Sequence, residues 1–313
     1  MLLFFLYLLL PFTCHATTLL LLETPFGFIA GADSRSSVPS TFSVVNPLSD
    51  KIMLITPNTL NLPATVPFFC VALMRTGTTS LTQHICRNII SACHDLASSS
   101  LYGAPPCNTW PLISVKTGLP PPTDPTLGIL PPITLLSLLA LLTQHVTAPS
   151  TDPNGAHGAL LSGYAHAATT GGAVSGVFEH MTRNSNVLDH SLKKRLDGRV
   201  ADMQRSGAGL VTGGSGGRDA RGVAESALKA IQTDTYTPSE ALTALKLEEG
   251  EVEYVDLAAR SVLHAIETDQ SSGGIARIVV VKREGEGAGS VKEILLETRR
   301  GKIEVLAVND RLQ

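Results

Sequence analysis

The segment ATTLLLLETPFGFIAGADSRSS, residues 16–37, decides the first part of the fold. It holds two apolar runs of strand length, and the turn-forming residues Pro25 to Gly27 lie between them. This pattern predicts two short strands joined by a tight turn. Two more apolar runs of strand length follow, KIMLITP at 51–57 and FFCVALM at 68–74. The chain therefore opens with a group of strands.

The rest of the chain also separates its helices from its strands. The predicted elements are helices over 80–96, 131–146, 220–231 and 255–267, a hairpin over 158–181, and strands over 275–281 and 293–308. Thr237-Pro238-Ser239-Glu240 predicts a capping box that begins another helix, with Thr237 as the cap. The segments 98–132 and about 184–207 read as insertions. Segregated groups of strands and helices favour an α+β fold.

Composition limits the classes of function that are open to the chain. With 313 residues and a formal net charge of -3, it has no basic excess for neutralising nucleic-acid phosphates. Its five cysteines have no framework spacing, which argues against a disulfide-stapled secreted domain. Only 11 charged residues lie in 1–170, whereas 40 lie in 171–313. The few charged side chains of the first half are therefore expected to have specific partners.

The first 12 residues, MLLFFLYLLLPF, carry no charge. An apolar run of this length is too short to span about 30 Å of hydrocarbon. It resembles the apolar region of a signal peptide, and Ala16 offers a small residue for cleavage before Thr17. It lacks the basic residues that normally precede such a region, so the residues alone leave a secretory signal open.

Two further motifs raise the question of a cofactor or a metal. The glycine-rich TGGSGG at 212–217 lacks the Lys-Ser or Lys-Thr of a phosphate loop and the third glycine of a dinucleotide fingerprint. It is read as a tight turn into a helix, or as a serine held at a bend beside an active site. Cys86 and Cys93 would lie about 10 Å apart along a helix, too far to share one zinc ion. We expect these thiols to pack along a buried face.

Segment 16–37 resembles the mature N-terminus of a catalytic proteasome β subunit, which has Thr-Thr, an apolar strand, Gly, a second strand and Ala-Asp-Ser-Arg. The other matching motifs are SDKIMLIT (49–56), RTGTTSL (75–81), TGGSGG (212–217) and TDQSSGGIARIVVV (268–281). The resemblance implies an N-terminal-nucleophile hydrolase with a four-layer α-β-β-α sandwich, in which two antiparallel sheets lie between helix layers. Residues 1–16 would be a signal-like propeptide, and 17–313 a single peptidase domain.

The resemblance also implies where and with what the protein works. The implied partners are other β subunits in a seven-membered ring, the adjacent α ring, and unfolded polypeptide substrates. No nucleic acid, membrane, cofactor or metal is implied. The implied location is the cytoplasm and nucleus, in ubiquitin-dependent protein catabolism.

The catalytic chemistry implied by the resemblance starts at Thr17. A threonine hydroxyl is a weak nucleophile that needs an adjacent base. An N-terminal threonine carries one, its own α-amine, whose ordinary pKa is about 7.7–8.0. Asp33 lies 16 residues later, so a hairpin can return it beside Thr17. Lys51 resembles the catalytic lysine and would lower the pKa of the hydroxyl. A purely structural ion pair of Asp33 with Lys51 is the alternative.

Ser215, Asp269 and Ser272 resemble the residues that relay protons around the threonine amine. Ser271 is an alternative to Ser272.

Gly77 resembles the glycine whose N–H group binds the oxyanion. Arg75 resembles the arginine of the caspase-like subunit, so the resemblance implies preference for an acidic residue before the cleaved bond. A helix-entry role for Gly77, and an ion pair between Arg75 and a neighbouring subunit, stay open. Two other functions also stay open: a non-catalytic structural β subunit and a secreted protein.

Overall fold

Residues 19–33 form the hairpin that their sequence predicts. Strand β1 (Leu19–Thr24) pairs antiparallel with β2 (Gly27–Asp33), with Leu19 opposite Ala32. The turn closes through a hydrogen bond from the Gly27 amide to the Thr24 hydroxyl, at 3.1 Å. A Cβ on Gly27 would lie 2.2 Å from the carbonyl oxygen of Val281, so the neighbouring strand leaves no room for a side chain there.

The computed structural model describes residues 17–37, 44–61, 68–77, 158–166, 174–181, 209–245, 247–248, 250–284 and 288–311. The further strands are β3 (Ser36–Ser37), β4 (Val44–Asn46), β5 (Ile52–Ile55), β6 (Phe69–Gly77), β7 (Gly158–His166), β8 (Val174–Met181), β9 (Leu210–Gly213), β10 (Ala276–Arg283), β11 (Gly289–Arg299) and β12 (Lys302–Arg311). The helices are the 3-10 helix η1 (Asn58–Leu60), α6 (Gly217–Gln232), α7 (Glu240–Thr243) and α8 (Glu251–Thr268).

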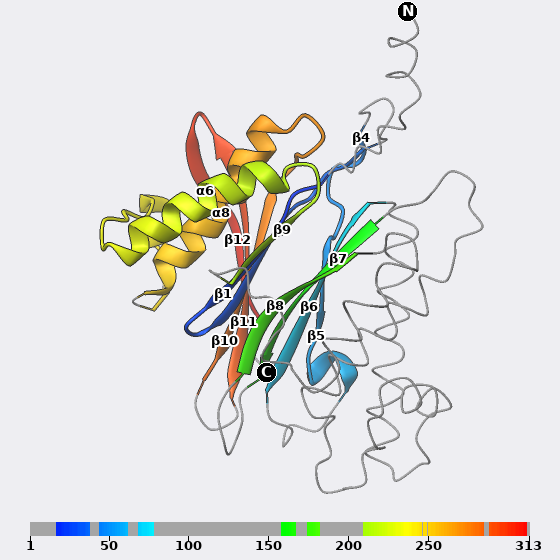
Figure 1. The fold of residues 1–313 in the computed structure, drawn as a ribbon, viewed down its shortest axis with the longest axis vertical. Coiled ribbons are helices and arrows are strands. Elements are labelled where there is room, and N and C mark those ends of the chain that lie inside the picture. Colours follow the sequence, from blue (N-terminus) through cyan, green and yellow to red (C-terminus); the bar gives the residue numbers. More distant parts are fainter. Residues whose placement is uncertain are drawn as a thin grey trace, which may run out of the picture.

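Two antiparallel sheets dominate this part of the chain. The larger sheet has the strand order β12-β11-β10-β2-β1-β9, and the smaller has the order β5-β6-β7-β8. The sheets face each other, and α6 and α8 lie side by side over the outer face of the larger sheet (Figure 1). Within the described residues, the hairpin β1–β2 therefore lies between the helices and the second sheet.

Burial on both faces of β1 explains its four consecutive leucines, Leu19 to Leu22, all of which are fully buried. Leu20 and Leu22 belong to the core beneath the helices, with Val255 and Val262 of α8. Leu19 and Leu21 belong to the core between the sheets, with Phe28, Cys70 and Met74 among its members. A strand with one face in water alternates polar and apolar residues, but both faces of β1 are buried, so every position in the run must be apolar.

The structure confirms most of the predicted elements that fall on described residues. The strands near 51–57 and 68–74, the strand pair within 158–181, helix α6 and the C-terminal strands are present. Helix α8 begins at Glu251, earlier than predicted.

The predicted capping box at 237–240 is wrong. Ser239, not Thr237, is the N-cap of the short helix α7, and its side chain makes no capping hydrogen bond. The Ser239 hydroxyl donates instead to the buried carboxylate of Asp256 on α8, at 2.5 Å. A buried carboxylate needs donors more than the helix end does, so the tertiary contact replaces the local one.

The predicted helices over 80–96 and 131–146, and both predicted insertions, lie outside the described residues. The described residues form one helix layer, the two larger sheets and the two-stranded sheet β3-β4. The second helix layer of an α-β-β-α sandwich would fall on the predicted helices, so the four-layer fold stays a prediction. No described helix is long and apolar enough to cross a membrane.

Candidate active site

Thr17 and Thr18 continue β1 at its N-terminal end, and their side chains are directed to different layers. The Thr18 amide donates to the Asp33 carboxylate at 2.6 Å, and the Asp33 amide donates to the Thr18 carbonyl at 3.2 Å. The Thr18 hydroxyl lies 2.8 Å from that of Ser272, close to the start of α6. Side chains alternate along a strand, so Thr17 shares the face of Leu19, which packs between the sheets. The second sheet, which carries Lys51 next to β5, lies on that face.

The structure brings Asp33 and Lys51 together. Asp33 ends β2, Lys51 immediately precedes β5, and the Lys51 ammonium lies 2.7 Å from Asp33 Oδ1. Both side chains are buried. The other carboxylate oxygen of Asp33 accepts a hydrogen bond from the Gly273 amide at 3.1 Å. Donors from three separate segments therefore hold this one carboxylate.

Burial and the charge of the partner shift the pKa of each residue of this pair in opposite directions. Burial lowers the pKa of Lys51, the ion pair with Asp33 raises it, and the nearby cations Arg75 and Arg35 lower it further. Burial likewise raises the pKa of Asp33, while Lys51 and the amides of Thr18 and Gly273 lower it. The pKa of Lys51 therefore lies below its ordinary value and that of Asp33 above its own, with burial as the largest cause in both.

A second polar group contacts the backbone nitrogen of Thr17 through Ser215. That nitrogen donates to the Ser215 hydroxyl at 3.3 Å. The Ser215 hydroxyl donates in turn to Asp269 at 2.6 Å, and it lies 2.7 Å from the Ser271 hydroxyl. Ser272 donates to the same Asp269 oxygen at 2.7 Å. Burial would raise the pKa of Asp269, but the hydrogen bonds from Ser215, Ser272 and Ser271 hold it below its ordinary value of 3.8.

Both adjacent serines take part, in different ways. Ser271 joins Ser215 to Asp269, whereas Ser272 joins Thr18 to Asp269. The resemblance assigned this role to Ser272 with Ser271 as the alternative, whereas in the structure Ser271 lies next to Ser215 and Ser272 lies next to Thr18.

The glycine-rich loop before α6 positions Ser215 by close backbone approach. Gly214 has a φ of +83°, and a Cβ there would lie 2.0 Å from the Thr17 carbonyl oxygen. A Cβ on Gly216 would lie 2.1 Å from the Thr18 hydroxyl. The Gly216 amide donates to the Thr17 carbonyl at 3.3 Å. Gly214 and Gly216 are therefore required because a side chain at either position would collide with Thr17 or Thr18.

Arg35 is a residue that sequence reasoning did not assign to the site. Its guanidinium donates to the carbonyls of Gln270 and Ser271, the latter at 3.4 Å, and it packs on Gly273. It therefore holds the loop that carries Asp269 and both serines. The available signal was the scarcity of charge, because Arg35 is one of the few basic residues in 1–170.

Arg75 and Gly77 lie on β6, beside β5. Arg75 is buried, and its guanidinium donates to the Asp50 carbonyl at 2.7 Å and to the Ser49 hydroxyl at 3.4 Å. Its amide donates to the Lys51 carbonyl at 3.1 Å. Gly77 ends β6 opposite Gly158, and the residues after it lie outside the described ranges. The predicted oxyanion and specificity roles thus stay predictions.

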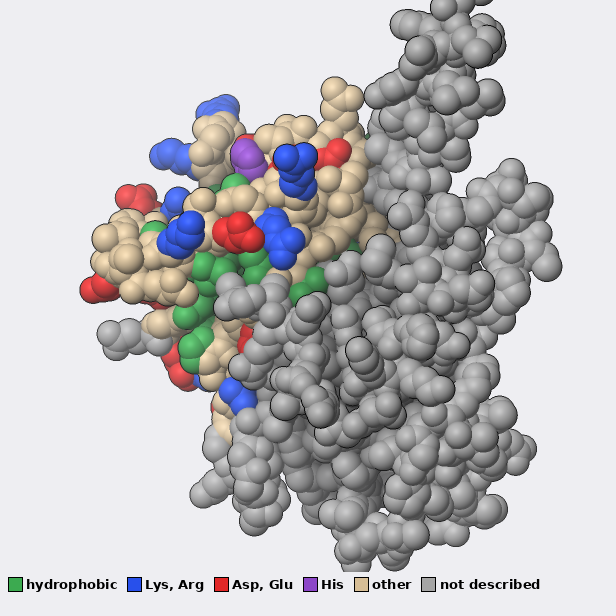
Figure 2. All heavy atoms as spheres, viewed as in Figure 1, with side chains coloured by type: hydrophobic (Ala, Val, Ile, Leu, Met, Phe, Trp, Pro, Cys, Tyr) green, Lys and Arg blue, Asp and Glu red, His purple; other side chains and the backbone are tan. Residues whose placement is uncertain are grey.

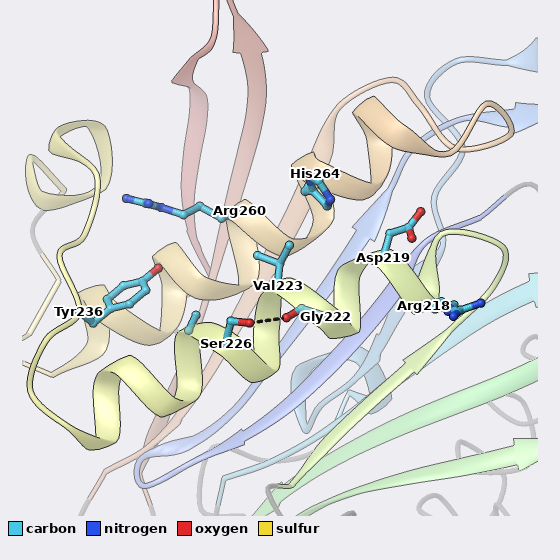
Figure 3. Close-up of a pocket in the computed structure, with 9 residues that line it drawn as sticks. Arg218, Asp219, Gly222, Val223, Ser226, Tyr236, Arg260 and His264 are labelled. Atoms are coloured by element: carbon cyan, nitrogen blue, oxygen red, sulfur yellow. Dashed lines mark hydrogen bonds between the residues drawn. The ribbon is translucent and has the colours of Figure 1, made fainter.

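A separate groove of about 570 Å³ lies on the outer face of α6 and α8. Its lining includes Arg218 on α6, Arg260 and His264 on α8, and Tyr236 in the segment between α6 and α7, all labelled in Figure 3. The surrounding helix face carries scattered side chains of both charges with hydrophobic side chains between them (Figure 2). Arg260 pairs with Asp256 at 2.6 Å. None of the predicted site residues lines this groove.

Among the described residues, no group of His, Cys, Asp and Glu is placed to hold a metal ion. The cysteine and histidine motif at 84–94 lies outside those residues. No protein-family model matches the chain, and no curated protein matches it.

Proposed function

We propose that this chain is a threonine endopeptidase subunit of a proteasome core particle, processed so that Thr17 becomes its N-terminus. One observation carries the proposal: two polar groups from distant parts of the chain flank the pair Thr17–Thr18. Asp33, which pairs with Lys51, accepts a hydrogen bond from the Thr18 amide, and Ser215, which joins Asp269 and Ser271, accepts one from the Thr17 nitrogen.

The proposed chemistry assigns the two groups different tasks. The Lys51 ammonium lowers the pKa of the Thr17 hydroxyl by stabilising the alkoxide that forms as it attacks a peptide carbonyl. The Thr17 α-amine accepts the hydroxyl proton and returns it to the leaving amine. Ser215 and the Asp269 carboxylate orient that amine and stabilise it when protonated. Water then hydrolyses the ester, which restores the hydroxyl.

Processing is a requirement of this scheme. While Ala16 is attached, the Thr17 nitrogen belongs to a peptide bond and cannot act as a base. Cleavage after Ala16 converts that nitrogen to an amine beside Ser215, whose oxygen is already 3.3 Å away. The same hydroxyl can perform this cleavage by attacking the Ala16 carbonyl, with water hydrolysing the resulting ester.

The finer parts of the proposal rest on the resemblance. Gly77 supplies the N–H group for the oxyanion, and Arg75 favours an acidic residue before the cleaved bond. Residues 1–16 act as a propeptide. The subunit works in the cytoplasm and nucleus within a β ring against an α ring, and it degrades unfolded polypeptides.

The test is the N-terminus and activity of the assembled protein. We expect intact-mass measurement to show a chain that begins at Thr17, with hydrolysis of fluorogenic peptides. Thr17→Ala should retain residues 1–16 and lose hydrolysis, whereas Thr17→Ser and the control Thr18→Ser should keep both processing and activity. A mature chain that begins at Thr18, or an active particle that retains residues 1–16, would contradict the proposal.

A further inference from the structure

Lys51 lies at the end of a short edge strand that the sheet alone holds weakly. Strand β5 has four residues and pairs only with β6 among the described strands. On the β6 side, Arg75 binds the backbone of residues 50 and 51 through its amide and its guanidinium. A residue on the larger sheet contacts the same segment, residues 50–52, from the other side.

That residue is Arg277 on β10. It shares the face of Val279 and Val281, which pack between the sheets, and its register partner on β2 is Ala32, next to Asp33. Its guanidinium donates to the Ile52 carbonyl at 2.8 Å and pairs with the Asp50 carboxylate. These two acceptors flank Lys51 in the sequence. Arg277 thus connects the sheet that carries Asp33 to the segment that carries Lys51.

The guanidinium is fixed from its own sheet by a third contact. Its Nε atom pairs with Glu293 on β11, and the Arg277 and Glu293 side chains are only 13% and 9% exposed. The Asp50 carboxylate also accepts a hydrogen bond from the Ile52 amide at 3.1 Å, which closes a turn around Lys51. One rigid planar cation therefore contacts three acceptors, which a lysine cannot reproduce.

We propose that Arg277 is a positioning residue that braces residues 50–52 against the larger sheet and so fixes the Lys51 ammonium beside Asp33. This inference rests on the proposed function, because it gives Arg277 a part in hydrolysis through Lys51. Arg277 itself touches neither the threonine nor the substrate.

The test compares processed particles that carry Arg277→Met, Arg277→Lys or the control Arg299→Met. Arg299 lies at the far end of β11, 63% exposed, and pairs with Glu297 and Glu304. Misplacement of a catalytic group by about 1 Å can cost about a hundredfold in rate, so we expect Arg277→Met to lower kcat at least about tenfold. KM should not change, because Lys51 acts on the chemical step. Arg277→Lys should restore part of kcat, and Arg299→Met should match the wild type.

Intact mass should be used to count processed chains, so that kcat is expressed for each free Thr17. If Arg277→Met does not assemble, Asp50→Asn takes its place, and it should also lower kcat with KM unchanged. Wild-type kcat in processed Arg277→Met with a lowered melting temperature would overturn the inference and leave the proposed function standing. A wild-type particle that hydrolyses no peptide would overturn both.

Discussion

The Lys51 ammonium lies 2.7 Å from the Asp33 carboxylate. Asp33 ends strand β2 of the larger sheet, and Lys51 immediately precedes strand β5 of the smaller sheet. The pair therefore links the two sheets at the end where β1 begins. Both side chains are buried, so neither charge can exchange its partner for water. Removing one partner of such a pair destabilises the fold and also removes the cation from the candidate site, so experiments must separate the two effects.

Replacing Lys51 by Met should abolish peptide hydrolysis. It should also lower the free energy of unfolding by about 3–5 kcal/mol, because it leaves the Asp33 carboxylate buried without its cation. The double variant Asp33→Asn/Lys51→Met removes that unpaired charge. We expect urea denaturation to show partial recovery of stability while hydrolysis stays absent. Recovery of hydrolysis together with stability would instead assign the pair a structural role alone.

Asp269 should contribute stability that depends on acid pH. Its pKa is held below the ordinary value of 3.8 by serine hydrogen bonds, so its stabilising effect is full above that pH and is lost as pH falls through the folded-state pKa. Asp269→Asn should therefore be less stable than the wild type near neutral pH, and the difference should shrink in acid. Urea denaturation across this range measures the difference. Asp310→Asn, on strand β12, is the control for loss of one carboxylate. If the stability difference between the wild type and Asp269→Asn stays constant with pH, the lowered pKa of Asp269 is contradicted.

Arg75→Met should change the specificity of hydrolysis. If the guanidinium binds an acidic substrate side chain, cleavage after glutamate should fall by about tenfold more than cleavage after leucine, as expected for one charge-assisted hydrogen bond. Fluorogenic peptides of the two kinds measure this ratio, with Arg75→Lys as the variant that keeps the charge. An equal fall on both peptides would limit Arg75 to its observed contacts with Ser49 and Asp50.

Gly214→Ala should disrupt the site without replacing any catalytic residue. The new Cβ would lie 2.0 Å from the Thr17 carbonyl oxygen, and the φ of +83° is unfavourable for alanine. We expect loss of processing and of hydrolysis. The control is Gly222→Ala within α6, where a Cβ meets nothing within 4 Å. Gly222→Ala should keep activity and gain about 0.5–1 kcal/mol of stability. A Gly214→Ala protein that is processed and hydrolyses peptides normally would contradict the packing argument.

The local elements were predictable because their patterns are local. The turn at 25–27 and the continuous leucine run predicted the hairpin, and burial on both faces of β1 explains why the run has no polar residue. The capping box failed because the helix has Ser239 rather than Thr237 as its N-cap, and the Ser239 hydroxyl donates to Asp256, 17 residues later, instead of to the helix end. Sequence spacing carries no information about such a competitor.

The sequence by itself determined which side chains were available to the candidate site: Thr17 at the start of a hairpin, Asp33 at its end, and Lys51, Ser215 and Asp269 in the matching motifs. Only the tertiary structure decided how they are connected. It divided the contacts between Ser271 and Ser272, and it placed Arg35 and Arg277 where they hold the loop and the lysine. The contacts of Ser272 with Thr18, of Arg35 with Ser271 and of Arg277 with Ile52 join residues more than 200 positions apart in sequence. A hydrogen bond forms only if the donor–acceptor distance is correct to within a few tenths of an ångström. The packing of two sheets and a helix layer sets these distances, and sequence spacing does not.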